Sequence, residues 1–387
     1  MRIFLTLHPA GNRFVPNSMT WYNNFYEPLV DSGHDVHFLR IDEVTKELGV
    51  RFGMKEFNRK FSQKLADDFI REHSKKPFDL FFAYLMDHDV EPACIDKIRE
   101  TGVPTANFSC NNIHQFYLTQ NLAAHFDFNL HSEKNAAEMF RSIGANPVWF
   151  QMAANPKYYH PMNLSREYDV SFIGSNYARR SFYVKHLLEN EMQVHCFGPD
   201  WLVRKPYSKL RKMIYEYRRI VTLTRALFSL SIEKRLEYST KVNYYDAQMD
   251  LRKRYGNMFH YPVSDDEMIK IINRSKINLG FLEVFEDHRG DKPVKQHLHL
   301  REFEIPMCGA LYMTNYSDEL AEFYEPDKEV ITFSNEHELL DKAGYYLKNE
   351  GEADKIRRAA LKRSLSCHTY QKRFNDLFIK LSLDKAR

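Results

Sequence analysis

The 387-residue sequence predicts an α/β protein built from two parallel-sheet domains. Three observations support this prediction. The length fits two domains of about 100–200 residues each. Short apolar strands alternate with helical segments, which is the order of a parallel sheet. Two prolines and a change in composition over residues 153–161 indicate a linker between two such runs. We therefore expect a first domain over residues 1–155, a second over residues 156–374, and a C-terminal tail over residues 375–387.

The overall composition is that of a globular protein without a strong charge bias. Hydrophobic residues make up 43% and charged residues 28% of the chain, and the net charge is only +3, so bulk charge does not predict nucleic-acid binding. The five cysteines are far apart and form no Cys-x-x-Cys pair, so we expect reduced thiols and neither a zinc site nor a disulfide framework. No apolar run reaches about 18 residues and the N-terminus does not resemble a leader peptide. These features predict a cytoplasmic protein.

The first half of the chain begins with a predicted strand–loop–helix–strand unit, with strands over residues 2–8 and 35–41 and a helix over residues 19–32. Loops at the carboxyl ends of parallel strands face the ligand, so the loop over residues 9–20 should point at whatever this domain binds. It lacks Gly-x-Gly-x-x-Gly and is therefore not a dinucleotide fingerprint. The other elements expected here are a helical stretch over residues 43–73, strands over 78–85, 103–109, 126–132 and 148–152, and helices over 91–101 and 133–143.

Titratable side chains follow two of these strands. The strand over residues 78–85 ends in Asp87, His88 and Asp89. Three interpretations stay open for this segment: a metal-binding Asp-x-Asp pair, a polar cap on the next helix, or a cleft-facing base in which Asp87 or His88 accepts a proton from an acceptor hydroxyl. His114, after the strand over residues 103–109, is a second candidate base, and the alternative for it is an ordinary solvent-exposed histidine.

The second half opens with a predicted strand over residues 168–173, followed by a glycine turn and a helix. The backbone N–H groups of a glycine turn at a helix N-terminus can bind an anion. Arg179 and Arg180 in the first turn would oppose the helix dipole unless an anion compensates them. We therefore expect Gly174, Ser175 and Arg180 to bind a diphosphate, with Arg179 as a further candidate. The alternative is a surface turn with two solvated arginines. A strand over residues 192–197 follows.

The segment over residues 204–254 differs in charge from the rest of the chain. It carries fourteen Lys or Arg residues against five Asp or Glu residues, and its apolar residues recur at helical spacing. This pattern predicts a basic helical insertion over about residues 204–256. A basic amphipathic helix can lie on an anionic membrane surface. The alternative is a helical excursion that packs on the domain and exposes a solvated basic face.

The stretch from Gln296 to Glu319 is the most informative part of the sequence. It predicts a helix that carries Arg301 and Glu304, breaks at Pro306 and turns at Gly309. Residues three apart on a helix are neighbours, so Arg301 and Glu304 share one face. A guanidinium can fork onto phosphate oxygens, and a carboxylate can accept hydrogen bonds from ribose or sugar hydroxyls. The alternative is an exposed ion pair. Replacing Arg301 is expected to abolish activity and leave the fold intact.

The other elements expected in this half are helices over residues 265–275, 316–324, 335–347 and 353–366, strands over 277–281, 310–313 and 329–333, a charged loop over 284–292, and a final helix that begins at residues 368–370.

Two motifs in this half resemble a known family. The pattern Arg301-x-Phe303-Glu304-x-x-x-Cys308-Gly309, with His368-Thr369-Tyr370-x-x-Arg373 downstream, is similar to that of the CgeB-type spore-maturation glycosyltransferases, relatives of the group-1 glycosyltransferases. The resemblance covers about residues 168–374 without the insertion. In the retaining group-1 relatives a second glutamate precedes the one that matches Glu304 by eight residues. Here that position is Gln296, which leaves the stereochemistry open.

The resemblance implies the GT-B fold, in which two Rossmann-like domains face a cleft. It implies transfer of a sugar from a nucleoside-diphosphate sugar to a hydroxyl of a glycan, a lipid-linked molecule or a protein, as in surface polysaccharide or glycoconjugate synthesis, without a metal or any cofactor besides the donor. The alternatives are a metal-dependent Asp-x-Asp transferase and a non-catalytic, membrane-associated protein. The residues expected to be catalytic are Asp87, His88 and Glu304, and those expected to bind the donor are Gly174, Ser175, Arg180, Arg301, Glu304 and Gly309.

Overall fold

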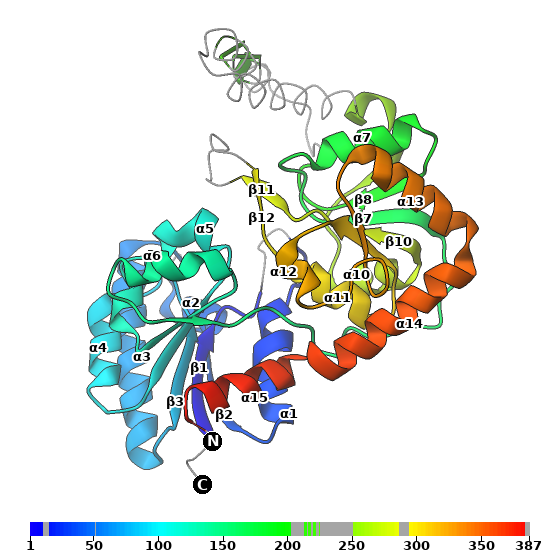
Figure 1. Ribbon diagram of the computed structural model, residues 1–387. Coiled ribbons are helices and arrows are strands. Elements are labelled where there is room, and N and C mark those ends of the chain that lie inside the picture. Colours follow the sequence, from blue (N-terminus) through cyan, green and yellow to red (C-terminus); the bar gives the residue numbers. More distant parts are fainter. Residues whose placement is uncertain are drawn as a thin grey trace.

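The computed structural model describes residues 1–10, 15–50, 52–202, 251–285 and 294–383, together with isolated positions between 213 and 224. In these residues the chain forms two six-stranded parallel sheets and one two-stranded antiparallel sheet (Figure 1). Each large sheet belongs to one half of the chain. The predicted α/β fold with two Rossmann-like domains is therefore confirmed, whereas the residue boundaries of these domains stay a prediction.

The first sheet has the strand order β2-β1-β3-β4-β5-β6, and every neighbouring pair is parallel. Its inner strands β1, β3 and β4 are almost completely buried, because helices cover both faces of the sheet, and β1 and β3 are correspondingly rich in apolar residues. The strands are β1 (Arg2–Leu7), β2 (Asp35–Arg40), β3 (Leu80–Tyr84), β4 (Thr105–Ser109), β5 (Phe128–His131) and β6 (Pro147–Trp149). The α-helices are α1 (Glu27–Asp31), α2 (Ile41–Leu48), α3 (Lys55–Lys75), α4 (Pro92–Arg99), α5 (Asn112–Gln115) and α6 (Ala137–Arg141), and a π-helix (Tyr22–Tyr26) precedes α1.

The second sheet has the strand order β14-β13-β10-β7-β8-β9, which is the order of a doubly wound nucleotide-binding sheet. Its strands are β7 (Tyr168–Ile173), β8 (Val194–Phe197), β9 (Phe259–His260), β10 (Ser275–Leu279), β13 (Tyr312–Asn315) and β14 (Ile331–Phe333). The helices of this half are α7 (Arg180–Glu189), α10 (Asp265–Asn273), α11 (Arg301–Met307), α12 (Asp318–Ala321), α13 (Glu336–Lys348) and α14 (Glu350–Cys367). The antiparallel pair is β11 (Glu283–Phe285) and β12 (Val294–Gln296).

Both large sheets reverse their strand order at one point, where ligands bind in open α/β sheets. In the first sheet this switch point lies between β1 and β3, and in the second it lies between β7 and β10. The loop that follows β7 contains Gly174 and Ser175. The fold thus places the predicted glycine turn at the ligand-binding edge of the second sheet.

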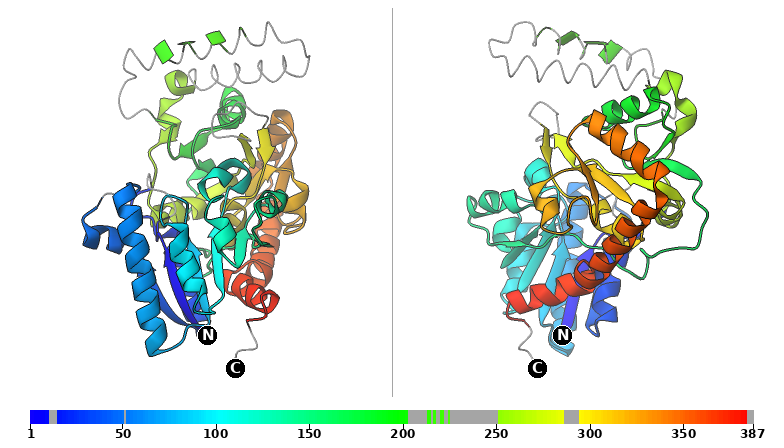
Figure 2. Two further views of the ribbon diagram at one scale, coloured as in Figure 1. Left: turned by 90° about the vertical axis from the view of Figure 1, so that its left-hand side faces the viewer. Right: turned by 45° about the vertical axis from the view of Figure 1, so that its right-hand side comes forward.

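The C-terminal helix α15 (Tyr370–Lys380) returns to the first domain (Figures 1 and 2). The Phe374 ring packs against the rings of Phe25 and Phe82 at centroid distances of 5.6 Å and 5.8 Å. Residues 375–380, which were predicted to belong to a tail, continue this helix, because Leu377 and Phe378 bury an apolar stripe against the same core. One cluster of buried side chains therefore joins both halves of the chain.

The His368-Thr369-Tyr370 motif fastens the point where the chain crosses between the domains. The Ala154 N–H donates to the His368 carbonyl at 3.1 Å, and the Tyr370 N–H donates back to the Ala154 carbonyl at 3.3 Å. The Thr369 hydroxyl accepts the Lys372 N–H and caps α15. One of the two motifs on which the family resemblance rests therefore has a structural role here.

Three predicted elements differ from the structure. The helix expected over residues 43–73 is divided at Gly49, whose φ of +63° ends α2. Pro306 does not break α11 but lies inside its last turn, and the helix ends at Met307 before Gly309, which also has a φ of +63°. The charged loop expected over residues 284–292 begins within a hairpin, because β11 and β12 pair antiparallel.

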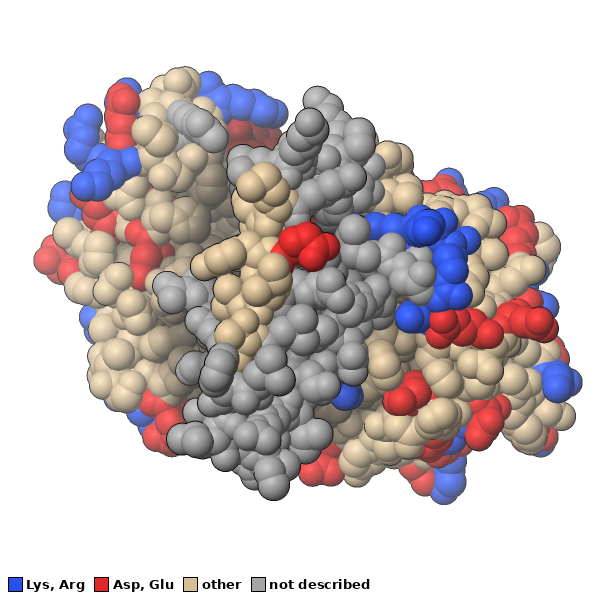
Figure 3. All heavy atoms as spheres, turned by 90° about the horizontal axis from the view of Figure 1, so that it is seen from above, with Lys and Arg blue, Asp and Glu red and all other residues tan. Residues whose placement is uncertain are grey.

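The basic insertion predicted over residues 204–256 lies almost entirely outside the described residues. Over the described part of the face shown in Figure 3, Lys and Arg side chains lie beside Asp and Glu side chains. In the part of the chain that the structure describes, no helix combines the length and apolar character needed to cross a bilayer.

Candidate active site between the two domains

A cavity of about 180 Å³ lies where the switch point of the second sheet meets the first domain. Residues from the ends of β7, β8 and β9 and from the starts of α10 and α11 form one wall, and residues that lead into the π-helix of the first domain form the other. The lining residues are Val15, Ser18, Thr20, Trp21, Ile173, Gly174, Ser175, Phe197, Gly198, Pro199, Pro262, Val263, Asp265, Met268, Leu300 and Arg301. Three of the predicted donor-binding residues, Gly174, Ser175 and Arg301, therefore meet at one cavity.

Arg301 begins α11 and forms an ion pair with Glu304, so the predicted shared helical face is confirmed. The pair is not on the surface, since Glu304 is completely buried and the Arg301 side chain is 28% exposed. The Arg301 Nε atom is buried and has no hydrogen-bond partner among the described residues. Because a buried guanidinium N–H is costly to leave unpaired, this atom is suited to a ligand oxygen in the cavity.

The Gly174–Ser175 turn is held tightly against the end of β8. A Cβ atom on Gly198, where φ is +153°, would lie 2.2 Å from the Gly174 carbonyl oxygen, so only glycine fits there. The Trp201 indole N–H donates to the same carbonyl at 2.8 Å. These contacts hold the turn in place, and Gly174 and Ser175 line the cavity.

Arg180 is oriented differently from the expectation. Its guanidinium is buried and donates to the carbonyl oxygens of Ser175 and Phe281 at 2.9 Å and 3.1 Å, and to the Tyr177 hydroxyl at 2.7 Å. It also lies 3.7 Å from the centre of the Tyr177 ring. Arg180 thus ties the glycine turn to the end of β10 and does not line the cavity, although its Nε atom is unpaired among the described residues.

Arg179, the further candidate, is paired within the second domain. Its guanidinium donates to both carboxylate oxygens of Glu283 and to the Tyr183 hydroxyl. The hydrogen bonds to Glu283 raise the pKa of Arg179, burial lowers it, and the charge of Glu283 raises it further. The net effect is a higher pKa. Its charge is therefore compensated without an external anion.

Gly309 does not join the cavity. Its positive φ ends α11, and its side-chain neighbours are Pro161 and Leu361. Gly309 and Pro161 line a separate pocket of about 480 Å³. The helix places Gly309 at its C-terminal end and Arg301 at its N-terminal end. Gly309 therefore shapes the helix, and the prediction that it contacts the donor gains no support from its position.

Asp265 is a cavity residue that the sequence reasoning missed. It lies in the first turn of α10, after the N-cap Ser264, and its carboxylate accepts the Met19 N–H from the first domain at 2.8 Å. Burial raises the pKa of Asp265, although the Met19 N–H and the Arg301 charge act in the opposite direction. The only signal in the sequence was an Asp in the first turn of a predicted helix. Such residues are common there, because a negative charge near the N-terminus interacts favourably with the helix dipole.

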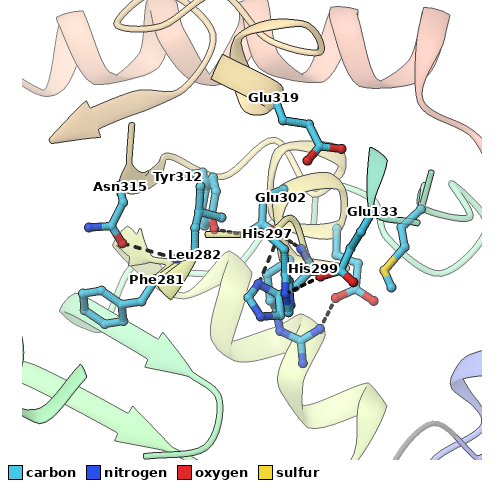
Figure 4. A network of polar contacts seen from close by, with 12 residues as sticks. Glu133, Phe281, Leu282, His297, His299, Glu302, Tyr312, Asn315 and Glu319 are labelled. Carbon is cyan, nitrogen blue, oxygen red and sulfur yellow. Dashed lines mark hydrogen bonds and ion pairs between the residues drawn. The ribbon is translucent and has the colours of Figure 1, made fainter. Parts of the chain in front are cut away.

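A second group of missed residues forms a buried polar network between the domains (Figure 4). Nδ1 of His297 lies 2.8 Å from Oε1 of Glu133, and both side chains are at least 94% buried. Burial raises the pKa of Glu133, but the contacts with His297 outweigh it and the net shift is downward. Glu133 and His297 lie in different domains, so no local pattern could have paired them.

His299 and Glu302 extend this network below the cavity. The His297 and His299 rings are 4.3 Å apart, and His299 Nε2 is 3.3 Å from the Tyr177 hydroxyl. Burial, followed by the charges of His297, Arg180 and Arg301, lowers the pKa of His299 well below its ordinary value. Glu302 accepts the His299 N–H and the Tyr312 hydroxyl. The network therefore pairs two histidines with two glutamates in the buried region between the domains.

Asp87, one of the predicted bases, and Asp89, its partner in the possible Asp-x-Asp pair, are both engaged with the backbone. The Asp87 carboxylate accepts the N–H groups of Asn121 and Leu122 and the Asn121 amide at 2.9–3.2 Å. The Asp89 carboxylate accepts the Met86 N–H at 2.7 Å, and burial raises its pKa to about 6. In the described part of the chain, no three His, Cys, Asp or Glu side chains are grouped so as to hold a metal ion.

The two histidine candidates lie in different surroundings. The His88 side chain is 40% exposed and packs edge-on against Phe52, as does His8 at the end of β1. Burial lowers the pKa of His8 to about 4. His114 follows β4 in α5, and its Nδ1 atom is buried. Of these two histidines, His88 is the more exposed, and its role as a base stays a prediction.

Two doubly wound domains with a cavity at their junction define the architecture of the GT-B glycosyltransferases. Residues 179–378, more than half of the chain, match the family described as glycosyl transferase-like. The chain therefore belongs to this family. The match confirms the predicted glycosyltransferase class and does not test the CgeB-type assignment.

Solved structures share the fold at low sequence identity. The chain is similar to sucrose-phosphate synthase from Thermosynechococcus elongatus (TM-score 0.55, 11% identity, 100% of both chains) and to a glycosyltransferase from Rickettsia africae ESF-5 (TM-score 0.56, 11% identity, 100% of this chain and 99% of the other). It is also similar to Anabaena Alr3699/HepE in complex with UDP-glucose (TM-score 0.58, 10% identity, 99% of both chains). No curated protein matches the sequence.

Proposed function

We propose that the protein transfers a sugar from a nucleoside-diphosphate sugar to a hydroxyl acceptor, and that the cavity between the domains binds the donor. Family membership supports the reaction class. The observation that carries the proposal is the meeting of the Gly174–Ser175 turn with the unpaired Nε atom of Arg301 at the switch point of the second sheet. A cation and a glycine turn at such an edge are suited to a diphosphate.

In this proposal the side chains at and around the cavity have different roles. Arg301 stabilises the negative charge that develops on the leaving diphosphate. Glu304, which has no exposed surface, orients Arg301 through their ion pair. Arg180, whose donors hold the carbonyls of Ser175 and Phe281, positions the glycine turn and does not contact the phosphates. The donor is the only small molecule that this scheme needs.

The metal-dependent alternative has less support from the geometry. A divalent cation would need the carboxylates of Asp87 and Asp89, but both accept backbone N–H groups of their own domain. The acceptor would bind in the first domain, opposite the cavity. A glycan, a lipid-linked molecule or a protein would each supply the required hydroxyl, and the structure does not favour one of them.

A ligand-induced shift in melting temperature tests the donor site. UDP is the first probe, because the similar HepE structure holds UDP-glucose; GDP, ADP, CDP and dTDP follow. A ligand at 100 times its dissociation constant stabilises the protein by about 2.7 kcal/mol. For a domain of this size that corresponds to a rise of about 5–11 °C in melting temperature.

Arg301→Lys keeps the charge but loses the fork of the guanidinium, so it should weaken nucleotide binding about 10-fold or more. The matched control is Arg363→Lys, since Arg363 pairs with Glu329 in a more exposed position at 3.0 Å and lines no described cavity. This control should bind like the wild type. A wild-type protein whose melting temperature does not change with any of the five nucleotides would refute the donor site.

A further inference from the structure

We infer that His297, held by Glu133 of the other domain, is the catalytic base that accepts the proton of the acceptor hydroxyl. This inference rests on the proposed transfer reaction. It replaces the base expected at Asp87 or His88 with a histidine and a glutamate from two domains. The reaction would then invert the configuration at the sugar carbon, because a single displacement needs one base and no nucleophile on the protein.

The first support is the geometry of the pair. Glu133 Oε1 lies 2.8 Å from His297 Nδ1, and the second oxygen of this carboxylate accepts the Ile113 N–H at 2.7 Å. A carboxylate beside Nδ1 favours the tautomer that carries its proton there, and the lone pair then lies on Nε2. This Nε2 atom is buried and has no hydrogen-bond partner among the described residues. A general base requires such a free lone pair.

The second support is the way the backbone holds His297. Its N–H donates to the Leu282 carbonyl at 3.1 Å, directly after the antiparallel pair β11–β12. The Leu282 N–H in turn donates to the Asn315 side chain at 3.2 Å, and the Phe281 carbonyl accepts from Arg180. The residues that support the glycine turn therefore also position the base (Figure 4).

The third support is the location beside the donor site. The His297 ring lies at a tilt beside the His299 ring, and His299 contacts Tyr177, whose ring lies under Arg180. In the proposed complex the diphosphate lies between Ser175 and Arg301, and the sugar extends toward His297. The residue before this histidine is Gln296, an amide that cannot serve as a protein nucleophile. The charged groups around His297 are Glu133, His299 and Glu302.

In the proposed step Nε2 of His297 removes the proton of the acceptor hydroxyl while that oxygen bonds to the anomeric carbon. The bond between this carbon and the diphosphate oxygen breaks, and its electron pair leaves with the nucleoside diphosphate. The resulting imidazolium is paired with Glu133 and then releases its proton to solvent. Every atom and charge is accounted for without a further reactant.

The test uses water as the acceptor, so the natural acceptor need not be known. The full chain is incubated with UDP-glucose, UDP-galactose or UDP-N-acetylglucosamine, and the release of UDP and the anomer of the first sugar product are measured. His297→Asn keeps a donor near the Nδ1 position for Glu133 but removes Nε2, whereas His297→Gln leaves Glu133 without its partner. Both should lower kcat by at least about 100-fold with little change in KM.

Glu133→Gln tests the positioning residue. It should lower kcat by at least about 10-fold with little change in KM, since the carboxylate holds the imidazole in place and does not bind the donor. The matched control is His125→Asn, because His125 Nδ1 lies 2.8 Å from Asp96 in a similar pair that stays within the first domain. This control should keep the wild-type kcat and KM.

Several outcomes would overturn the inference. They are retention of the anomeric configuration, a His297→Asn rate within threefold of the wild type, loss of rate in His297→Gln alone, or a large loss in His88→Asn with little loss in His297→Asn. A protein that binds UDP yet hydrolyses none of the three donors would also contradict a base poised at the sugar. Failure to bind any nucleotide would instead refute the donor site itself.

Discussion

The buried pair of Arg301 and Glu304 makes a quantitative prediction about stability. Glu304 has no exposed surface, so removing Arg301 leaves an uncompensated carboxylate inside the protein. Breaking a buried pair on one side costs about 3–5 kcal/mol, whereas replacing both partners by apolar residues of similar volume is close to neutral. Arg301→Met and Glu304→Met should therefore each destabilise the protein, and the double substitution should restore most of the loss.

The assay is the melting temperature of the four proteins of this cycle. For domains of about 150–250 residues, 1 kcal/mol corresponds to about 2–4 °C, so Arg301→Met should melt about 6–20 °C below the wild type. The control is Lys355→Met, which breaks the exposed pair with Glu352 at the same i, i+3 spacing. That pair is worth only about 0.2–1 kcal/mol.

Two results would refute this reasoning. One is an Arg301→Met protein that melts within about 2 °C of the wild type. The other is a double mutant whose loss of stability equals the sum of the two single losses, since the coupling energy would then be absent. This prediction differs from the expectation from the sequence that replacing Arg301 leaves the fold intact, because Glu304 is completely buried.

Two further predictions concern the glycine turn and the dependence of stability on pH. Gly198→Ala should destabilise the protein by about 2–5 kcal/mol and weaken UDP binding, because its Cβ would overlap the Gly174 carbonyl; Gly102→Ala, where φ is also positive but the space is open, should cost only about 1–2 kcal/mol in the same denaturant titrations. Burial lowers the pKa of His368 from 6.5 to about 4. The unfolded chain then binds a proton that the native protein excludes, so stability should fall as the pH drops from 6.5 to 4. His368→Asn should remove about 3 kcal/mol of that fall, and an unchanged pH profile would contradict the assignment.

The sequence by itself determined the features that depend on neighbouring residues. An apolar strand such as β3 is visible as a short run, because a strand buried on both faces favours apolar residues at consecutive positions. The shared face of Arg301 and Glu304 follows from helical geometry alone. The glycine turn after β7 was predicted for the same reason, since strand, turn and helix are contiguous.

Only the tertiary structure decided which of these residues meet and how deeply they are buried. The contact of His297 with Glu133 joins two domains, and no periodicity in the sequence encodes a contact between residues so far apart. Arg180 points inward because the carbonyls of Ser175 and Phe281 converge there after folding. The exposed ion pair that was the alternative for Arg301 and Glu304 is excluded, because Glu304 is completely buried with Tyr159 and Tyr370 near it. Desolvation by distant parts of the chain is the physical quantity that local sequence does not carry.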